Sequence, residues 1–143
     1  MCGIVGGYDI SDVENTLKSI VHRGRDASGV AQVGSVSFGH VRLSIIDVSS
    51  LSNQPFVVGD TTLVFNGTIW NYQGVREYLI KEYGVTFKTT GDVEVITNLI
   101  DKEDYHGLNR LQGMFAVAWT KGDDDIHLAR DRFGEVPLHY SLL

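Results

Sequence analysis

The chain has 143 residues, of which 43% are hydrophobic and 21% are charged, and this composition is typical of an ordinary globular domain rather than of a disordered chain. The formal net charge of −6 argues against nucleic acid as the main partner, because phosphate binding needs a basic surface. No apolar run is long enough to span a membrane, the first residues carry no basic leader, and there is a single cysteine. We therefore expect one cytoplasmic domain with a reduced thiol.

That single cysteine is the second residue of the chain. Cys2 precedes a glycine-rich apolar run at residues 3–8, which predicts a short buried strand. Removal of Met1 would leave Cys2 with an α-amine beside its thiol, and an N-terminal amine, which titrates near ~8, can accept the thiol proton. The alternative is an inert packing cysteine at the beginning of a strand.

Helix and strand patterns alternate along the first half of the chain. Asp12 can cap a helix over residues 13–21, and residues 22–26 break that pattern as a loop. Two strands are expected next, at 28–33 and 36–47 around a Gly34-Ser35 turn, followed by a polar loop at 49–55 and a strand at 61–66.

The second half contains two amphipathic helices and further strands. Asn71 can cap a helix over residues 72–83 that ends at Gly84, and Asp92 opens a second helix. Strands are expected at 113–120, 126–130 and 137–143. Paired strands mixed with helices predict an α+β layered domain.

Two charged residues lie where a charge needs a partner. Arg42 lies inside the apolar stretch VRLSIID, where an unpaired charge is costly. Its forked guanidinium can bind a carboxylate ligand or form a structural ion pair with Asp47 or another acid, and burial alone does not decide between the two. Asp92 can cap its helix, the commoner role for Asp in that place, or hold a substrate ammonium.

Asn66-Gly67 follows an expected strand and has two interpretations. The pair is typical of a tight hairpin turn. An Asn side-chain amide and a Gly backbone N–H can also both donate to a developing oxyanion. The histidines lack metal-ligand spacing and no phosphate-binding glycine motif is present, so we expect neither a metal nor a cofactor.

Several segments, in this order, resemble the glutaminase domain of class II glutamine amidotransferases, specifically of the asparagine synthetase type. They are MCGI, HRGRDASG, GHVRLSIID, QP, NGTIWNY, TTGDVEVI, LQGMFAVA and ARDRFGEVPLHY. They span nearly the whole chain, and together they are far more specific than any one alone. The resemblance implies an N-terminal nucleophile hydrolase fold, a four-layer αββα sandwich of antiparallel sheets, compact or C-terminally shortened, with residues 1–143 as one glutaminase domain.

The resemblance also implies the chemistry at Cys2. Its thiol would attack the side-chain amide of L-glutamine and form a thioester, with the α-amine of the same residue moving the proton. Asn66 and Gly67 would form the oxyanion hole. For the HRG and ARDRFG segments, loop bracing and interior ion pairing are alternatives to a catalytic role.

The substrate's two charges would be recognised by two side chains of opposite sign. By resemblance, Arg42 would hold the α-carboxylate and Asp92 the α-ammonium. The backbone around Ile46 and the residue Thr68 would complete the pocket.

The chain departs from the family pattern in three places. Arg25 replaces the usual proline of HRGPD, and Thr68 replaces the usual glutamate of NGEIYN. No ATP-pyrophosphatase segment occurs before Leu143, so we expect that the chain cannot make asparagine alone and that a separate ATP-dependent synthetase subunit receives the ammonia.

Two other functions stay open. A catalytically retired glutaminase fold would bind glutamine or a partner without turnover, which Arg25, Thr68 and the short C-terminus favour. Another N-terminal nucleophile hydrolase would act on a different amide. Recognition of both a carboxylate and an ammonium speaks against that last function.

Overall fold

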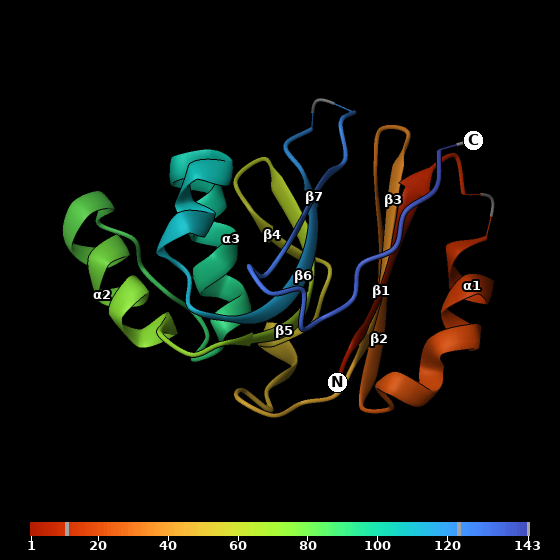
Figure 1. Ribbon diagram of the computed structural model, residues 1–143, viewed down its shortest axis with the longest axis horizontal. Helices are drawn as coiled ribbons and strands as arrows, with labels where there is room; N and C mark the ends of the chain where they lie inside the picture. Colours follow the sequence, from red (N-terminus) through yellow and green to blue (C-terminus); the bar gives the residue numbers. More distant parts are fainter. Residues whose placement is uncertain (11, 123, 143) are drawn as a thin grey trace.

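Two antiparallel sheets lie face to face between helices in the computed structural model, which describes residues 1–10, 12–122 and 124–142 (Figure 1). The first sheet has the order β1-β3-β2 and consists of β1 (Gly3–Tyr8), β2 (Ala27–Val33) and β3 (Val36–Arg42). The second sheet has the order β4-β5-β6-β7 and consists of β4 (Phe56–Val58), β5 (Thr61–Ile69), β6 (Gly113–Thr120) and β7 (His127–Arg130).

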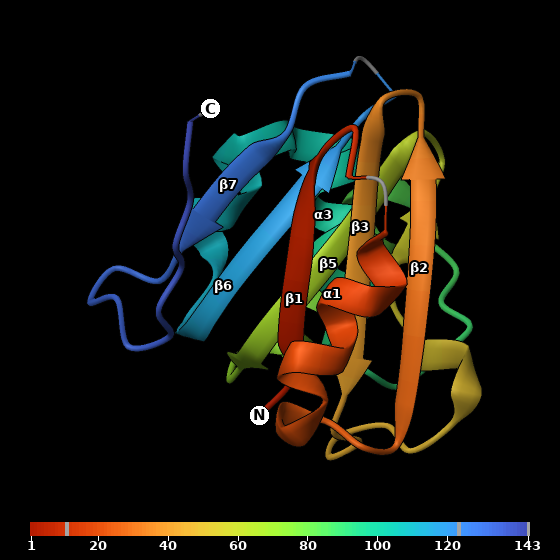
Figure 2. The same cartoon turned by 90° about the vertical axis from the view of Figure 1, so that its right-hand side faces the viewer.

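Helices cover the outer faces of both sheets. Helix α1 (Val13–Ile20) packs on β1 and β3, as Figure 2 shows. On the other side, α3 (Asp92–Glu103) packs on β4 and β5, and α2 (Tyr72–Tyr83) packs on α3. Three short 3₁₀ turns complete the described chain: η1 (Val21–Arg23), η2 (Ser50–Ser52) and η3 (Asp104–Arg110). The expected αββα layering is confirmed, and no helix within the described ranges is long and apolar enough to cross a lipid bilayer.

Strand alternation divides β5 between two apolar cores. Leu63 and Phe65 point toward α3, whereas Val64 lies in the layer between the sheets, against Phe38 of β3. Asn66 has the same parity as Val64, so its side chain also points into the layer between the sheets. The alternation of β5 thus brings a polar amide close to the beginning of β1.

The alternating face of β3 carries a buried histidine as well as an arginine. His40 is fully buried, and burial lowers the pKa of its imidazole to about 4. The imidazole is therefore neutral at physiological pH. Arg42 lies two residues further along the strand and on the same face.

The helix ends match the sequence pattern in part. Asp12 caps α1, accepting a hydrogen bond from the Asn15 N–H at 2.7 Å. Gly84 closes α2 in the left-handed conformation at φ +66°. Asn71 precedes α2 but does not cap it with its side chain, which instead bonds the backbone of Arg110 and Gln112.

Several strand predictions were wrong. β3 ends at Arg42 rather than at Asp47, because the Arg42 guanidinium bonds carbonyl groups of the segment that follows and folds it into a loop. β5 runs through Asn66-Gly67, so this pair is not a hairpin turn: pairing with β6 overrides its local turn preference.

The second sheet differs from the prediction at one edge and near the chain end. β4 has only three residues, and the sequence pattern does not predict it. The described part of the expected last strand, residues 137–142, is not a strand. Its side chains are mostly exposed, so pairing as a strand would not be stabilised by burial of an apolar face.

Candidate functional site

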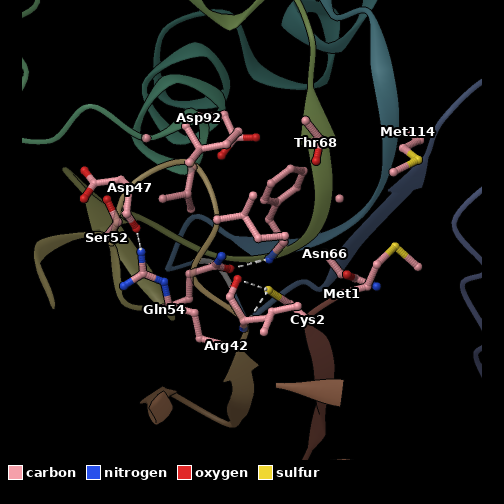
Figure 3. A pocket seen from close by; sticks show the side chains of 17 residues that line it. Met1, Cys2, Arg42, Asp47, Ser52, Gln54, Asn66, Thr68, Asp92 and Met114 are labelled. Atoms are coloured by element: carbon pink, nitrogen blue, oxygen red, sulfur yellow. Dashed lines mark hydrogen bonds between the residues drawn. The ribbon is translucent and has the colours of Figure 1, made fainter. Parts of the chain in front are cut away.

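A pocket of about 120 Å³ opens where the two sheets and the beginning of α3 meet (Figure 3). Its walls come from the beginning of β1, the loop after β3, the edge of β5, the first turn of α3 and the beginning of β6. All seven residues singled out from the sequence line it: Cys2, Arg42, Ile46, Asn66, Gly67, Thr68 and Asp92.

Cys2 is held in the pocket wall by its neighbours. The Leu43 N–H donates to its Sγ at 3.4 Å, and the thiol lies 3.7 Å from the Leu43 carbonyl oxygen. Arg23 Nε donates to the Cys2 carbonyl at 3.0 Å, which gives the arginine of the HRG segment a bracing role. The side chain is half-buried and faces the pocket, so its sulfur is oriented yet reachable.

Arg42 is a buried cation whose bonding partners are uncharged. Its exposed fraction is 6%, and Nη1 donates to the Ser49 carbonyl at 2.6 Å and to Asn53 Oδ1 at 2.7 Å, while Nη2 donates to the Asp47 carbonyl. Of the carboxylates that the structure describes, none forms an ion pair with it. The expected alternative of an Arg42–Asp47 salt bridge is therefore wrong.

Asp47 uses its carboxylate to join two loops. It accepts hydrogen bonds from the Ser49 N–H at 2.8 Å and from the Thr90 N–H and hydroxyl at 2.9 and 3.1 Å. These bonds from Ser49 and Thr90 hold the pKa of the carboxyl well below its usual range. Its negative charge is therefore already satisfied by the loop that follows Arg42 and the segment before α3.

Asp92 is a buried acid in the same pocket, with an exposed fraction of 7%. It is the first residue of α3, Gly91 occupies the N-cap, and the capping role expected for Asp92 is not found. Its Oδ2 accepts a hydrogen bond from the Ile69 N–H at 3.1 Å. Burial raises the pKa of its carboxyl, and within residues 1–10, 12–122 and 124–142 no cationic side chain pairs with it.

The edge of β5 between these charges is open toward the pocket. Gly67 has φ +153°, and a Cβ there would lie 2.2 Å from the Met114 carbonyl oxygen, so only glycine fits. Asn66 is 5% exposed, and its Oδ1 has no hydrogen-bond partner in the described chain. In Figure 3 it lies beside Cys2 and Met1.

Other lining residues were not proposed from the sequence. Gln54 appeared there only as part of the QP segment, yet it is 7% exposed and its Oε1 accepts a hydrogen bond from the Phe65 N–H at 2.6 Å. Met114 lines the pocket from the strand opposite Thr68. No local sequence signal identifies either residue, because Met114 reaches the pocket through strand pairing and Gln54 through the loop that precedes β4.

The ARDRFG segment lies outside this pocket and braces a loop. The Asp131 carboxylate accepts four backbone N–H bonds, from Phe115, Phe133, Glu135 and Val136. These bonds outweigh its burial and lower the pKa of the carboxyl to about 2. The structural alternative stated for this segment therefore describes Asp131.

Comparisons with known proteins place the whole chain in one family. The sequence model described as "Glutamine amidotransferase domain" matches residues 1–143. The chain is 39% identical to asparagine synthetase [glutamine-hydrolyzing] 1 of Bacillus subtilis, over 100% of this chain and 24% of that protein. It is 38% identical to asparagine synthetase B of Escherichia coli, over 97% and 26%, and 34% identical to the amidase chyE of Penicillium rubens, over 94% and 20%.

The chain thus spans about a quarter of the length of these curated relatives or less. Among solved structures, it superposes on the glutamine phosphoribosylpyrophosphate amidotransferase of B. subtilis with a TM-score of 0.73, at 22% identity, over 91% of this chain and 36% of that one. This likeness supports the fold. The chain belongs to the glutamine amidotransferase domain family, as a class II member of the asparagine synthetase type with the fold of an N-terminal nucleophile hydrolase.

Proposed function

We propose that this domain hydrolyses the side-chain amide of L-glutamine to glutamate and ammonia, with Cys2 as the nucleophile. One observation carries the proposal: a buried guanidinium and a buried carboxylate, neither in an ion pair within the described chain, line the pocket that holds the only cysteine. An unpaired buried charge is costly, so such a pair indicates a ligand that brings the opposite charges. The α-carboxylate and α-ammonium of an amino acid match Arg42 and Asp92.

In the proposed reaction, Cys2 Sγ bonds to the amide carbon of glutamine and the carbonyl oxygen becomes an oxyanion. The Asn66 side-chain amide and the Gly67 N–H donate to that oxyanion. The α-amine of Cys2 takes the thiol proton and delivers it to the departing nitrogen, which leaves as ammonia. Water then attacks the thioester, releases glutamate and restores the thiol.

The unpaired Asn66 Oδ1 supports this arrangement. It is a buried acceptor in the wall that also holds Met1 and Cys2. Removal of Met1 creates an α-amine that can donate to it, while the amide nitrogen of Asn66 stays available for the oxyanion.

We further propose that the ammonia passes to an ATP-dependent synthetase unit. The relatives named as asparagine synthetases are about four times longer than the matched region, and their names couple glutamine hydrolysis to synthesis.

Thr68 is uncharged and the Asp47 carboxylate already accepts hydrogen bonds, so Asp92 is the acid among the pocket residues that remains to bind the substrate ammonium.

Processing at Met1 is expected to control activity, because an attached Met1 turns the α-amine into an amide. Intact-mass analysis should find the active protein lacking one methionine, and that protein should release glutamate from glutamine. A diazo-ketone analogue of glutamine should add once, at Cys2, and Cys2→Ala should abolish glutamate release. Fully processed, folded protein that binds glutamine without releasing glutamate would instead favour the retired enzyme.

Glutamine binding is expected to weaken at acidic pH. Because burial raises the pKa of Asp92, its carboxyl becomes neutral at a higher pH than an exposed aspartate and then loses the ammonium. The KM for glutamine should rise as the pH falls through that raised pKa, and Asp92→Asn should raise KM about 10- to 100-fold and remove this dependence. Steady-state kinetics with glutamine over a series of acidic to neutral pH values measures this.

The exposed Asp60, which lies outside the pocket, provides a matched control for that experiment. Asp60→Asn should leave both KM and its pH profile unchanged. If the KM of Asp92→Asn still rose at low pH as it does in the wild-type protein, another group would bind the ammonium.

Gly67→Ala is expected to lower kcat about 100-fold or more, because the new Cβ displaces the backbone N–H that stabilises the oxyanion. Gly74 in α2 is the matched control: a Cβ there meets nothing within 4 Å, so Gly74→Ala should leave kcat unchanged. The control should even stabilise the fold, by about 0.5–1 kcal/mol. Full activity in folded Gly67→Ala, measured with thermal unfolding, would exclude Gly67 as a donor.

A further inference from the structure

We infer that Gln54 is a positioning residue for the oxyanion hole. Its side chain supplies the hydrogen-bond acceptor that a neighbouring strand would otherwise supply, close to the Gly67 N–H. This inference rests on the proposed function, since it needs an oxyanion to form in this pocket. Gln54 itself contacts none of the reacting atoms in the proposed mechanism. Its effect is transmitted through β5.

The strand register explains why a side chain is needed at this place. β4 pairs with β5 from Val58↔Thr61 to Phe56↔Leu63. Two further residue pairs in the same register would place Gln54 opposite Phe65, but the ladder ends at Phe56. The Gln54 side chain bonds Phe65 in place of a strand backbone: its Oε1 accepts a hydrogen bond from the Phe65 N–H at 2.6 Å in a buried position.

Strand alternation then places the Gly67 N–H at the open edge of β5. Phe115 lies opposite Gly67, and both of its backbone groups are hydrogen-bonded to Asp131. The Phe115 N–H donates to Asp131 Oδ2 at 3.2 Å, and the Phe115 carbonyl accepts a hydrogen bond from the Asp131 N–H at 2.8 Å. Phe115 therefore points its backbone groups away from β5. Directly opposed residues of an antiparallel pair share this orientation, so those of Gly67 point away from β6 and toward the pocket side.

Three N–H groups thus follow one another along this edge, at Phe65, Gly67 and Ile69. The outer two are anchored by side chains, since Gln54 binds Phe65 and Asp92 binds Ile69 at 3.1 Å. The middle one is the donor assigned to the oxyanion. Two anchors that flank a donor fix its direction before the substrate arrives, which is the condition for electrostatic stabilisation without reorganisation.

The two anchors differ in what else they do. Asp92 also carries the charge proposed to hold the substrate ammonium, so its loss affects glutamine binding. Gln54 is neutral, and both substrate charges are already assigned to other side chains. Loss of the Gln54 bond should therefore weaken the transition state more than the bound substrate.

Gln54→Met tests the inference, because methionine keeps the length of the side chain and removes the acceptor. We expect kcat to fall about 10- to 100-fold, the range for a displaced oxyanion donor, with KM for glutamine nearly unchanged. Inhibition by glutamate γ-semialdehyde, which adds to Cys2 and forms an oxyanion in the same place, should weaken in parallel. Gln54→Glu keeps an acceptor oxygen and should retain kcat, while its added charge raises KM.

Gln112→Met is the matched control, since Gln112 is exposed and does not line the Cys2 pocket. It should leave kcat, KM and aldehyde inhibition unchanged. Circular dichroism and thermal unfolding establish that each variant is folded. If Gln54→Met does not fold, Gln54→Asn, whose shorter amide does not reach Phe65, should show the same loss of kcat.

Amide hydrogen exchange separates this inference from the proposed function. In the wild-type protein the Phe65 amide should exchange slowly, and in Gln54→Met it should exchange at least about tenfold faster, together with Gly67. Equal exchange in both proteins, or unchanged kcat and aldehyde inhibition in folded Gln54→Met, would overturn the positioning role. Failure of the wild-type protein to release glutamate would overturn the function while the exchange result still decides whether Gln54 anchors β5.

Discussion

The site depends on a buried guanidinium that has no carboxylate partner in the described chain. Arg42 is surrounded by carbonyl and amide oxygens from the loop that follows its own strand, so it shapes that loop while keeping its net charge. The carboxylate of Asp47, the nearest acid in the sequence, accepts hydrogen bonds from Ser49 and Thr90. We propose that the anionic group of a ligand neutralises Arg42 in this pocket.

The second constraint is an interrupted sheet edge. β4 pairs with β5 over only three residue pairs, and the backbone donors of β5 beyond them face the Cys2 pocket. Side chains of Gln54 and Asp92 accept hydrogen bonds from two of these donors, and the third, the Gly67 N–H, is the one that we propose for the oxyanion. Unpaired strand edges expose backbone donors and acceptors to other chains, and here the pocket encloses the unpaired part of β5.

The sequence patterns located those elements whose local signals agree with the fold. The glycine-rich run after Cys2 predicted β1 with its observed bounds, and Asp12 caps α1 as expected. Prediction failed where long-range pairing overrides a local preference: Asn66-Gly67 has typical turn chemistry but lies inside β5, because β6 pairs with it on both sides of the glycine. The partners of Arg42 and the role of Gln54 depend on loop geometry and strand register, which no single-sequence pattern encodes.

We propose that the pocket recognises an amino acid through both of its charges. Calorimetric titration of processed Cys2→Ala protein, which cannot turn the ligand over, tests it with L-glutamine and two analogues: glutaramate, which lacks the ammonium, and 4-aminobutanamide, which lacks the carboxylate. We expect each analogue to bind at least about tenfold more weakly than glutamine, since each leaves one buried charge unpaired. Binding of either analogue as tightly as glutamine would show that the pocket does not recognise that charge.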